Sequence, residues 1–307
     1  MDEERTLTPT LTNSTTALHS TVRLTPPATE PFIPPLTILE SASFSIKRLA
    51  TELYTHRELL GFLAWRDVKV RYQQTALGVL WALLQPLLTM LVFALFLGRV
   101  AGLVAAPTIP YSLFLLSGLV PWMFFANALI SSSQSIVGSQ QLITKVYFPR
   151  LAIPLSAVLA CGVDFVIMMI LLLGFTFFDG VLLTWTSMLL PLCMLGIIAT
   201  AAGMGTWLSA LTVAYRDFRF IIPFMVQIGM FLTPVVYGWE QMPSPWKWFL
   251  LVNPMTGWVE AFRACLFESW NWRVSGMLAT SIVLTAGLNL SSWYYFQRVE
   301  RRFADVI

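Results

Sequence analysis

Charged residues are distributed along this chain so that long apolar stretches contain none of them. Uncharged runs separate five pairs of charged residues: Arg71 and Arg99, Arg99 and Lys145, Asp179 and Arg216, Arg219 and Glu240, and Arg273 and Arg298. A bilayer core requires about 20 apolar residues per helix, and these runs supply them. The exposed face of a soluble core would instead carry charged residues every turn or so. The pattern therefore predicts a membrane protein.

The apolar stretches predict an all-α polytopic membrane protein with six transmembrane helices in residues 77–297. The expected spans are 77–98, 111–134, 151–178, 188–213, 219–238 and 274–296. Pro243, Pro245 and Pro254 interrupt the apolar segment 239–270 between the fifth and sixth spans. Because proline breaks helices, we expect short re-entrant helices there, dipping into the outer leaflet.

The two ends of the chain are expected to be cytoplasmic. Residues 1–40 are rich in Thr, Pro and Ser and lack both a basic start and an apolar run, so they predict a disordered tail instead of a cleaved signal peptide. The segment 41–76 mixes bulky apolar side chains with Lys and Arg, which predicts a helix at the cytoplasmic membrane interface. The apolar face of this helix is not clearly separated from its polar face, because Arg66 falls among the apolar positions on a helical wheel. Residues 298–307 form the expected C-terminal tail.

Composition agrees with a membrane location and indicates an orientation. Hydrophobic residues make up 57% of the chain and charged residues 11%, against about 25% charged in an average globular protein. With both termini inside, 15 of the 19 Lys and Arg residues are cytoplasmic and only Arg99, Lys247, Arg263 and Arg273 are outside. The external segment also carries six tryptophans, as an interfacial aromatic belt would.

Several classes of chemistry have no support in the sequence. The three cysteines have no paired spacing, so they predict neither a metal site nor a disulfide framework. No GxxxxGK[ST] motif occurs, and none of the four lysines follows a glycine-rich loop that would cradle phosphates. The chain either works passively or relies on an ATPase in another polypeptide.

Five motifs occur in an order and spacing that closely resemble the ABC-2 type permeases of bacterial polysaccharide exporters, including O-antigen and teichoic-acid transporters. They are the run RDVKVRYQQTALGVLWALLQPLLTMLVFALFL from Arg66, KVYFPR at 145–150, YRD at 215–217, TPVVY at 233–237 and NP at 253–254. The resemblance extends from about Glu58 to Arg302. It implies a permease in the bacterial inner membrane, not an enzyme.

The resemblance also implies partners. In that family the loop carrying KVYFPR forms a coupling helix that docks into a groove on the partner ATPase. The corresponding candidates here are Gln140, Lys145, Val146, Tyr147, Phe148 and Arg150. Large aromatic anchors on a short polar loop suit a protein interface, although aromatic residues also lie at the headgroup level. We expect a homodimer with two ATPase subunits, which bind the ATP and magnesium, and neither a cofactor nor nucleic acid on this chain.

An undecaprenyl-pyrophosphate-linked glycan is the cargo that the resemblance implies. Arg66, Lys69 and Arg71 at the inner face are candidates for attracting the pyrophosphate, since it carries two or more negative charges. The same cluster would also satisfy anionic lipid headgroups.

Candidate conduit residues are aromatic side chains in or near the spans, together with one acid. The aromatic candidates, whose ring faces could stack on sugar rings, are Trp122, Tyr237, Trp239 and Phe93. The resemblance supports this role, because related exporters line their channel with aromatic rings. Aromatic residues in spans nevertheless face lipid or a neighbouring helix more often. Asp164 is the one acid inside an expected span. An ionised carboxylate there costs about 3 kcal/mol or more, so it should be protonated, paired, or facing water or protein.

Other classes remain as alternatives. Within the family, the chain could export drugs, lipids or teichoic acids. A secondary carrier predicts internal repeats and several buried ionisable groups, whereas the spans hold one. A membrane-embedded transferase predicts clustered acids or histidines, and His19 and His56 belong to no such cluster. Gln85-Pro86 predicts a bend in the first span, either a lateral gate or a fixed kink.

Overall fold

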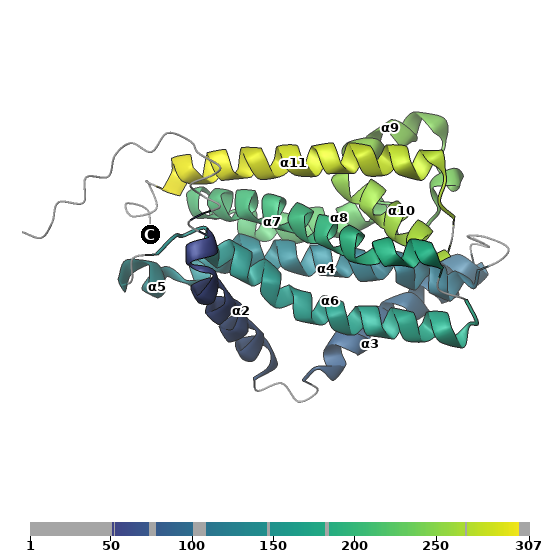
Figure 1. Ribbon diagram of the computed structural model, residues 1–307, viewed down its shortest axis with the longest axis horizontal. Helices are drawn as coiled ribbons and strands as arrows, with labels where there is room; N and C mark the ends of the chain where they lie inside the picture. Colours follow the sequence, from purple (N-terminus) through teal and green to yellow (C-terminus); the bar gives the residue numbers. More distant parts are fainter. Residues whose placement is uncertain are drawn as a thin grey trace, which may run out of the picture. The chain divides into compact units, whose positions relative to one another are not determined.

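The computed structural model describes residues 51, 53–73, 78–100, 109–145, 148–181, 184–267 and 269–300. All of them belong to one compact unit, Phe44–Ile307. The expected tails, 1–40 and most of 298–307, lie outside the described residues. Within the described ranges every regular element is a helix and no strand occurs, as the all-α prediction requires (Figure 1).

The helices follow one another along the chain with short connections. Their bounds are α2 Arg57–Tyr72, α3 Leu80–Phe93, η1 Ala94–Val100, α4 Tyr111–Gly138, α5 Gln140–Lys145, α6 Ala152–Phe178, η2 Trp185–Leu189, α7 Leu190–Ala214, α8 Phe218–Phe231, η3 Trp239–Gln241, α9 Ser244–Val252, α10 Pro254–Phe267 and α11 Trp272–Glu300.

Five helical segments are long and apolar enough to cross a bilayer, and they coincide with five of the six expected spans. They are Leu80–Gly98, Tyr111–Gly138, Ala152–Phe178, Trp185–Ala214 and Trp272–Glu300. The first continues from α3 into the π-helical η1, and the fourth combines η2 with α7.

The helix expected over 219–238 is shorter in the structure. Helix α8 has 14 residues and ends at Phe231, after which the chain turns. Pro234 explains part of the difference, because the residue before a proline is disfavoured in the helical conformation. Fourteen residues rise only about 21 Å, less than the roughly 30 Å of a hydrocarbon core. Two short helices, α9 and α10, occupy most of the segment 239–270 expected to be re-entrant.

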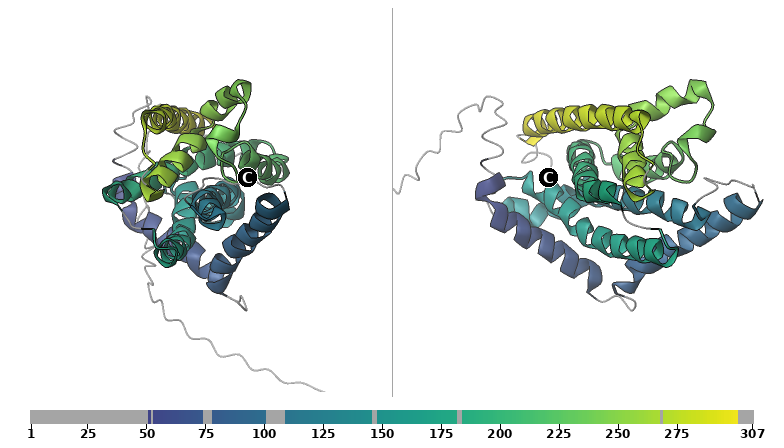
Figure 2. Two further views of the ribbon diagram at one scale, coloured as in Figure 1. Left: turned by 90° about the vertical axis from the view of Figure 1, so that its right-hand side faces the viewer. Right: turned by 45° about the vertical axis from the view of Figure 1, so that its right-hand side comes forward.

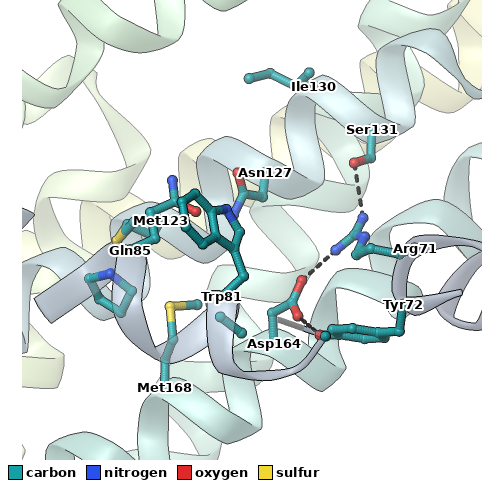
Figure 3. Close-up of a pocket in the computed structure, with 13 residues that line it drawn as sticks. Arg71, Tyr72, Trp81, Gln85, Met123, Asn127, Ile130, Ser131, Asp164 and Met168 are labelled. Atoms are coloured by element: carbon teal, nitrogen blue, oxygen red, sulfur yellow. Dashed lines mark hydrogen bonds and ion pairs between the residues drawn. The ribbon is translucent and has the colours of Figure 1, made fainter. Parts of the chain in front are cut away.

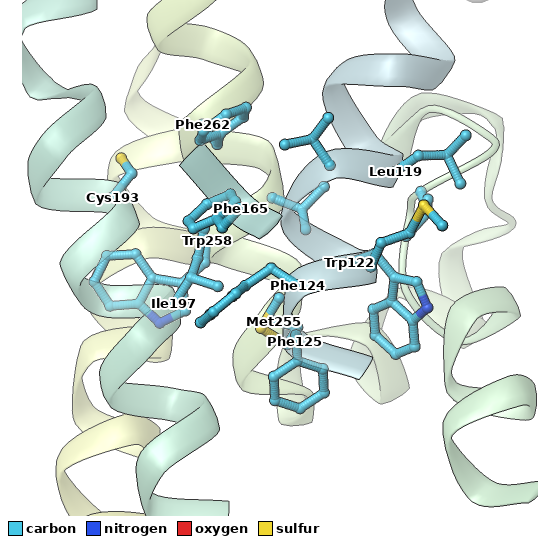
Figure 4. Packing of buried hydrophobic residues seen from close by; sticks show 14 of the residues in the cluster. Leu119, Trp122, Phe124, Phe125, Phe165, Cys193, Ile197, Met255, Trp258 and Phe262 are labelled. Carbon is cyan, nitrogen blue, oxygen red and sulfur yellow. The ribbon is translucent and has the colours of Figure 1, made fainter. Parts of the chain in front are cut away.

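Helix α4 forms the centre of the bundle. It packs most extensively against α6 and α7, and α11 covers α7 and α10. Of the most apolar stretch of α4, 83% is buried, against 11% for the span that contains α3. Figure 4 shows the aromatic part of this core, where the Phe124 ring stacks on the Phe165 ring with centroids 4.6 Å apart.

The long helices place two groups of short elements at opposite ends of the bundle (Figures 1 and 2). We call them the α5 end, where α5, the start of α2 and the end of α11 lie, and the α9 end, where α9 and α10 lie. Close approach holds α10 in place. A Cβ atom added at Gly257 would lie 2.2 Å from the backbone oxygen of Met277 in α11.

Candidate functional site

The segment expected to couple the chain to an ATPase, residues 140–150, begins at the α5 end, and we call it the coupling segment. Helix α5 covers the first six residues of this segment, Gln140–Lys145. A hollow of about 660 Å³ separates it from α2 and is lined by Arg66 and residues 137–142. Gln140 is exposed. Val146 and Tyr147 lie outside the described residues, and so does the side chain of Lys145.

Phe148 is held inside the chain. Its side chain is 8% exposed and belongs to a packed group that we call the α5-end cluster. The buried members of this cluster are Leu63, Ile136, Phe148, Leu151, Ala152, Ile153, Ala210, Val213 and Phe296. They come from α2, α4, α6, α7 and α11 as well as from the coupling segment. Packing of the Phe148 side chain in this cluster therefore attaches the last part of the coupling segment to the helix bundle.

Arg150 ties the same segment to the end of α11. Its guanidinium donates a hydrogen bond to the backbone oxygen of Glu300 at 2.7 Å, and its Nε lies 4.0 Å from the Glu300 carboxylate. The docking candidates Phe148 and Arg150 are thus brought together with α11, which the sequence did not suggest.

The three basic candidates of α2 have different surroundings. Arg66 is partly exposed and pairs with its neighbour Asp67 at 2.7 Å. Lys69 is exposed. Arg71 instead turns into the bundle, where it forms an ion pair with Asp164 of α6. The structure leaves Arg66 and Lys69 on the surface and separates Arg71 from them.

Asp164 is the centre of a polar network (Figure 3). Its carboxylate accepts hydrogen bonds from the guanidinium of Arg71 and the hydroxyl of Tyr72. The guanidinium also lies 3.2 Å from the hydroxyl of Ser131 and 3.2 Å from the sulfur of Cys161. Burial and the hydrogen bond to Asp164 raise the pKa of Tyr72. The one acid inside the expected spans is therefore paired, one of the arrangements that its position requires.

The network forms one wall of a cavity of about 630 Å³ between the end of α2, the start of α3, and helices α4 and α6. The lining is mainly apolar: Trp81, Ala82, Pro86, Met123, Ile130 and Met168. Two side-chain amides, those of Gln85 and Asn127, also face it. Figure 3 shows both Asn127 and Trp81 on the side of the cavity away from Tyr72. Gln85 and Pro86, where the sequence predicts a bend, both line this cavity.

The turn that follows α8 is a second polar arrangement, which the sequence did not reveal. Val235 and Val236 are almost fully buried although their backbone is not helical. Arg263 of α10 donates to the backbone oxygens of Pro234 at 3.1 Å and Val235 at 3.0 Å. Tyr111 of α4 donates to the next carbonyl, that of Val236, at 2.9 Å. The carbonyls freed where α8 stops are thereby satisfied.

Arg263 is itself fully enclosed. It forms a 3.1 Å ion pair with Glu260, one helical turn earlier, and its guanidinium carbon lies 3.8 Å above the centre of the Phe114 ring. Gly118 allows this approach, because a Cβ atom there would lie 2.5 Å from the guanidinium. The sequence did contain one signal for this site: Glu260 and Arg263 are spaced i, i+3 in an otherwise apolar segment, which favours an ion pair on one face of a helix.

The aromatic conduit candidates do not meet at one point. Trp122 is buried in the core, with its ring 5.5 Å from that of Phe125. Tyr237 donates to the backbone oxygen of Phe231 at 2.9 Å, and Trp239 lies under the ammonium of Lys247 at the α9 end. Phe93 contacts Phe231 edge to face, with centroids 6.5 Å apart, and so joins α3 to α8. Within one subunit none of these side chains lines the cavity of Asp164.

The sequence profile of the ABC-2 type transporter family matches residues 58–267. An O-antigen export system permease protein of Klebsiella pneumoniae is 30% identical over 256 residues, which cover 81% of this chain and 95% of the relative. Its counterpart from Myxococcus xanthus is 33% identical over 72% of this chain and 85% of that protein. A polysialic acid transport protein of Escherichia coli is 24% identical over 67% of this chain and 80% of its own length.

Proposed function

Because this chain belongs to the ABC-2 type transporter family, we propose that it is the permease subunit of an ABC transporter that exports a lipid-linked polysaccharide across the bacterial inner membrane. The observation that carries the proposal is the similarity to O-antigen export permeases over 81% of the chain. Membership of this family implies an ATPase partner in a separate subunit. ATP and magnesium are then bound by that subunit.

We propose that two copies of the chain form the passage, above two ATPase subunits. Helices α3 and α8 support this arrangement, because both expose apolar side chains that a single subunit leaves uncovered. On α8, the exposed large side chains include Phe220, Phe224 and Phe231. The contact of Phe93 with Phe231 joins the last residues of α3 and α8. A conduit between two such faces would be lined by aromatic rings.

The α5 end is the cytoplasmic end in this proposal. It holds the start of α2, the coupling segment and the end of α11, whose basic residues favour the inside. The α9 end instead exposes Trp185, Trp246, Trp248 and Trp272, which suit the outer interface. Both termini are then cytoplasmic, and α9 and α10 enter the outer leaflet.

The proposed cargo is a glycan on undecaprenyl pyrophosphate. Arg66 and Lys69 remain on the surface of α2, where they could attract the diphosphate, whereas the charge of Arg71 is already balanced by Asp164. The pairing of Asp164 also argues against a proton-driven carrier, since a relay group has to exchange protons. Export of teichoic acids, drugs or other lipids would use the same fold.

Co-purification tests the coupling part of the proposal. Tyr147→Ala should reduce recovery of the ATPase with the permease and slow ATP-driven export of the lipid-linked glycan. Trp185→Ala is the matched control, because Trp185 is 80% exposed at the opposite end. Unchanged association for Tyr147→Ala and for Phe148→Ala would refute the docking assignment. The unfolding midpoint of Phe148→Ala has to be measured alongside, since its side chain is buried.

Reconstitution tests the function itself. The permease and its ATPase together should move undecaprenyl-diphosphate-linked glycan in proteoliposomes when ATP is supplied, and the permease alone should not. Uphill transport by the permease alone, driven by a proton gradient, would refute the proposal.

A further inference from the structure

We propose that the cavity beside the Arg71–Asp164 pair binds an amine-bearing zwitterionic phospholipid of the phosphatidylethanolamine class. The lipid comes from the cytoplasmic leaflet. This inference requires only that the chain lies in a membrane with the α5 end inside, and it does not depend on the cargo.

The depth of the cavity corresponds to the inner headgroup region. Helix α3 begins at Leu80, directly beside the cavity residues Gly78 and Trp81. A span of about 20 residues counted from Tyr111, at the outer start of α4, ends near Ile130 and Ser131. Both of these residues line the cavity. The polar wall therefore lies where the headgroups of the inner leaflet meet the acyl chains.

The charges on the polar wall match a zwitterion. Arg71 supplies one cation and Asp164 one anion, a few ångströms apart and both reaching the cavity. A phosphatidylethanolamine headgroup carries one phosphate and one primary ammonium, separated by two methylene groups. The phosphate can face the guanidinium while the ammonium donates to the carboxylate, and both contacts are charge-assisted. An anionic headgroup would gain attraction from Arg71 but meet repulsion from Asp164.

Two amides supply further polar groups. The side chains of Gln85 and Asn127 face the cavity, and neither has a hydrogen-bond partner within the part of the chain that the structure describes. Polar groups at membrane depth are normally satisfied, so a polar ligand or water belongs there. The glycerol and ester oxygens of a phospholipid are suitable acceptors for the amide N–H groups.

The rest of the cavity suits acyl chains. Trp81, Pro86, Met123 and Met168 form an apolar wall beyond the amides. Trp81 is 55% exposed, and the span that begins with α3 is the least buried of the five. An acyl chain can leave the cavity past the exposed start of α3, away from the Phe93 end that faces the second copy in the proposed dimer.

Lipid binding to the intact transporter tests the inference. The full-length permease with its ATPase is stripped of lipid in detergent and then titrated with one dioleoyl lipid at a time. The lipids are phosphatidylethanolamine, phosphatidylcholine and phosphatidylglycerol, and undecaprenyl diphosphate serves as the cargo-like probe. Native mass spectrometry gives the occupancy. Phosphatidylethanolamine should bind at least tenfold more tightly than phosphatidylcholine, whose quaternary ammonium has no N–H to donate to Asp164.

Two variants locate the site. Asn127→Ala should weaken binding of phosphatidylethanolamine about three- to tenfold, as expected for one lost hydrogen bond. Gln134→Ala is the matched control, because this exposed amide lies on the same helix outside the cavity and should change nothing. Asp164→Asn should remove the preference for phosphatidylethanolamine over phosphatidylcholine. If Asp164→Asn does not fold, the affinity of Asn127→Ala for phosphatidylethanolamine still tests whether the lipid binds in this cavity.

Three results would overturn the inference. The first is equal affinity for phosphatidylethanolamine and phosphatidylcholine. The second is an Asn127→Ala variant that behaves like Gln134→Ala. The third is displacement of phosphatidylethanolamine by undecaprenyl diphosphate in a way that Asn127→Ala abolishes, which would assign the cavity to the cargo. All three results come from binding measurements, so they test the lipid site even where the transporter does not export the proposed cargo.

Discussion

Replacing Arg263 by methionine should strongly destabilise the permease, because this side chain satisfies the turn after α8. The variant removes the donor for the carbonyls of Pro234 and Val235 and leaves the Glu260 carboxylate without its cation. The volume of the side chain is nearly kept, so the effect reports on hydrogen bonds and charge.

The magnitude follows from the burial of these groups. One buried polar group without a partner costs about 1–3 kcal/mol. Removing one member of a buried ion pair costs about 3–5 kcal/mol, because the other charge stays behind. The two costs overlap, since they share the same side chain, so we expect about 3–5 kcal/mol in total. For a chain of this size that corresponds to a decrease in the unfolding midpoint on the order of 10 °C.

The exposed pair of Arg273 and Glu240 provides a matched control at the same end of the bundle. Its side chains are 48% and 74% exposed, and an exposed pair contributes about 0–1 kcal/mol. Arg273→Met should therefore change the midpoint by less than about 3 °C. Arg263→Lys should be intermediate, because one ammonium cannot reproduce the several contacts of the guanidinium.

A thiol-reactive dye provides the assay, because Cys161, Cys193 and Cys265 are all buried and free. The purified full-length variants are heated in one detergent, and the dye reports unfolding as the thiols become exposed. Adding Glu260→Gln to Arg263→Met should recover part of the loss, since the orphaned charge is removed. Equal midpoints for Arg263→Met and Arg273→Met would refute the reasoning.

Three further predictions use the same thermal assay. A double-mutant cycle of Arg71→Gln and Asp164→Asn should give a coupling energy of about 1–3 kcal/mol, and a value near zero would contradict the buried pair. Gly257→Ala should lower the midpoint because its Cβ atom would lie 2.2 Å from a backbone oxygen of α11, whereas Gly287→Ala, with no neighbour within 4 Å, should not. Trp258→Phe should cost more than the about 1 kcal/mol of its 3.0 Å hydrogen bond to a threonine of α11, because the smaller ring also leaves a cavity against Gly196.

The spans were predictable because the bilayer imposes a simple rule on composition. An uncharged apolar run of about 20 residues is typical of a transmembrane helix and uncommon elsewhere, and five of the predicted runs are helices of suitable length. The end of α8 was not predictable in the same way. Thr233 to Tyr237 is as apolar as a helix would be, and although Pro234 disfavours the helix, the carbonyls of the turn are satisfied by donors from Arg263 and Tyr111. Hydropathy cannot show a donor that lies elsewhere in the chain.

The partner of Asp164 illustrates the same limit. The energetic cost of a charge in a span indicated that the carboxylate would be paired, protonated or facing water or protein. The sequence did not indicate which residue pairs with it, because Arg71 lies 93 residues earlier, in a segment expected on the membrane surface. Similarly, counting Arg263 among the outer basic residues gave no sign that it is enclosed between α4 and the turn after α8.

The packing of α2 explains how a short segment, cytoplasmic in the proposed orientation, can act on the whole bundle. Near its middle, Leu63 belongs to the α5-end cluster together with Phe148 and Phe296, and at its end Arg71 is fixed to Asp164. Protein interiors are packed densely, so Phe148 cannot shift without moving these neighbours or opening a void. Movement of the coupling segment is therefore shared at once by α2, α7 and α11, and α2 carries it to the polar wall of the cavity beside α3. In the proposed docking, the buried side chains connect the coupling segment to the spans, and the exposed residues of α5 face the ATPase.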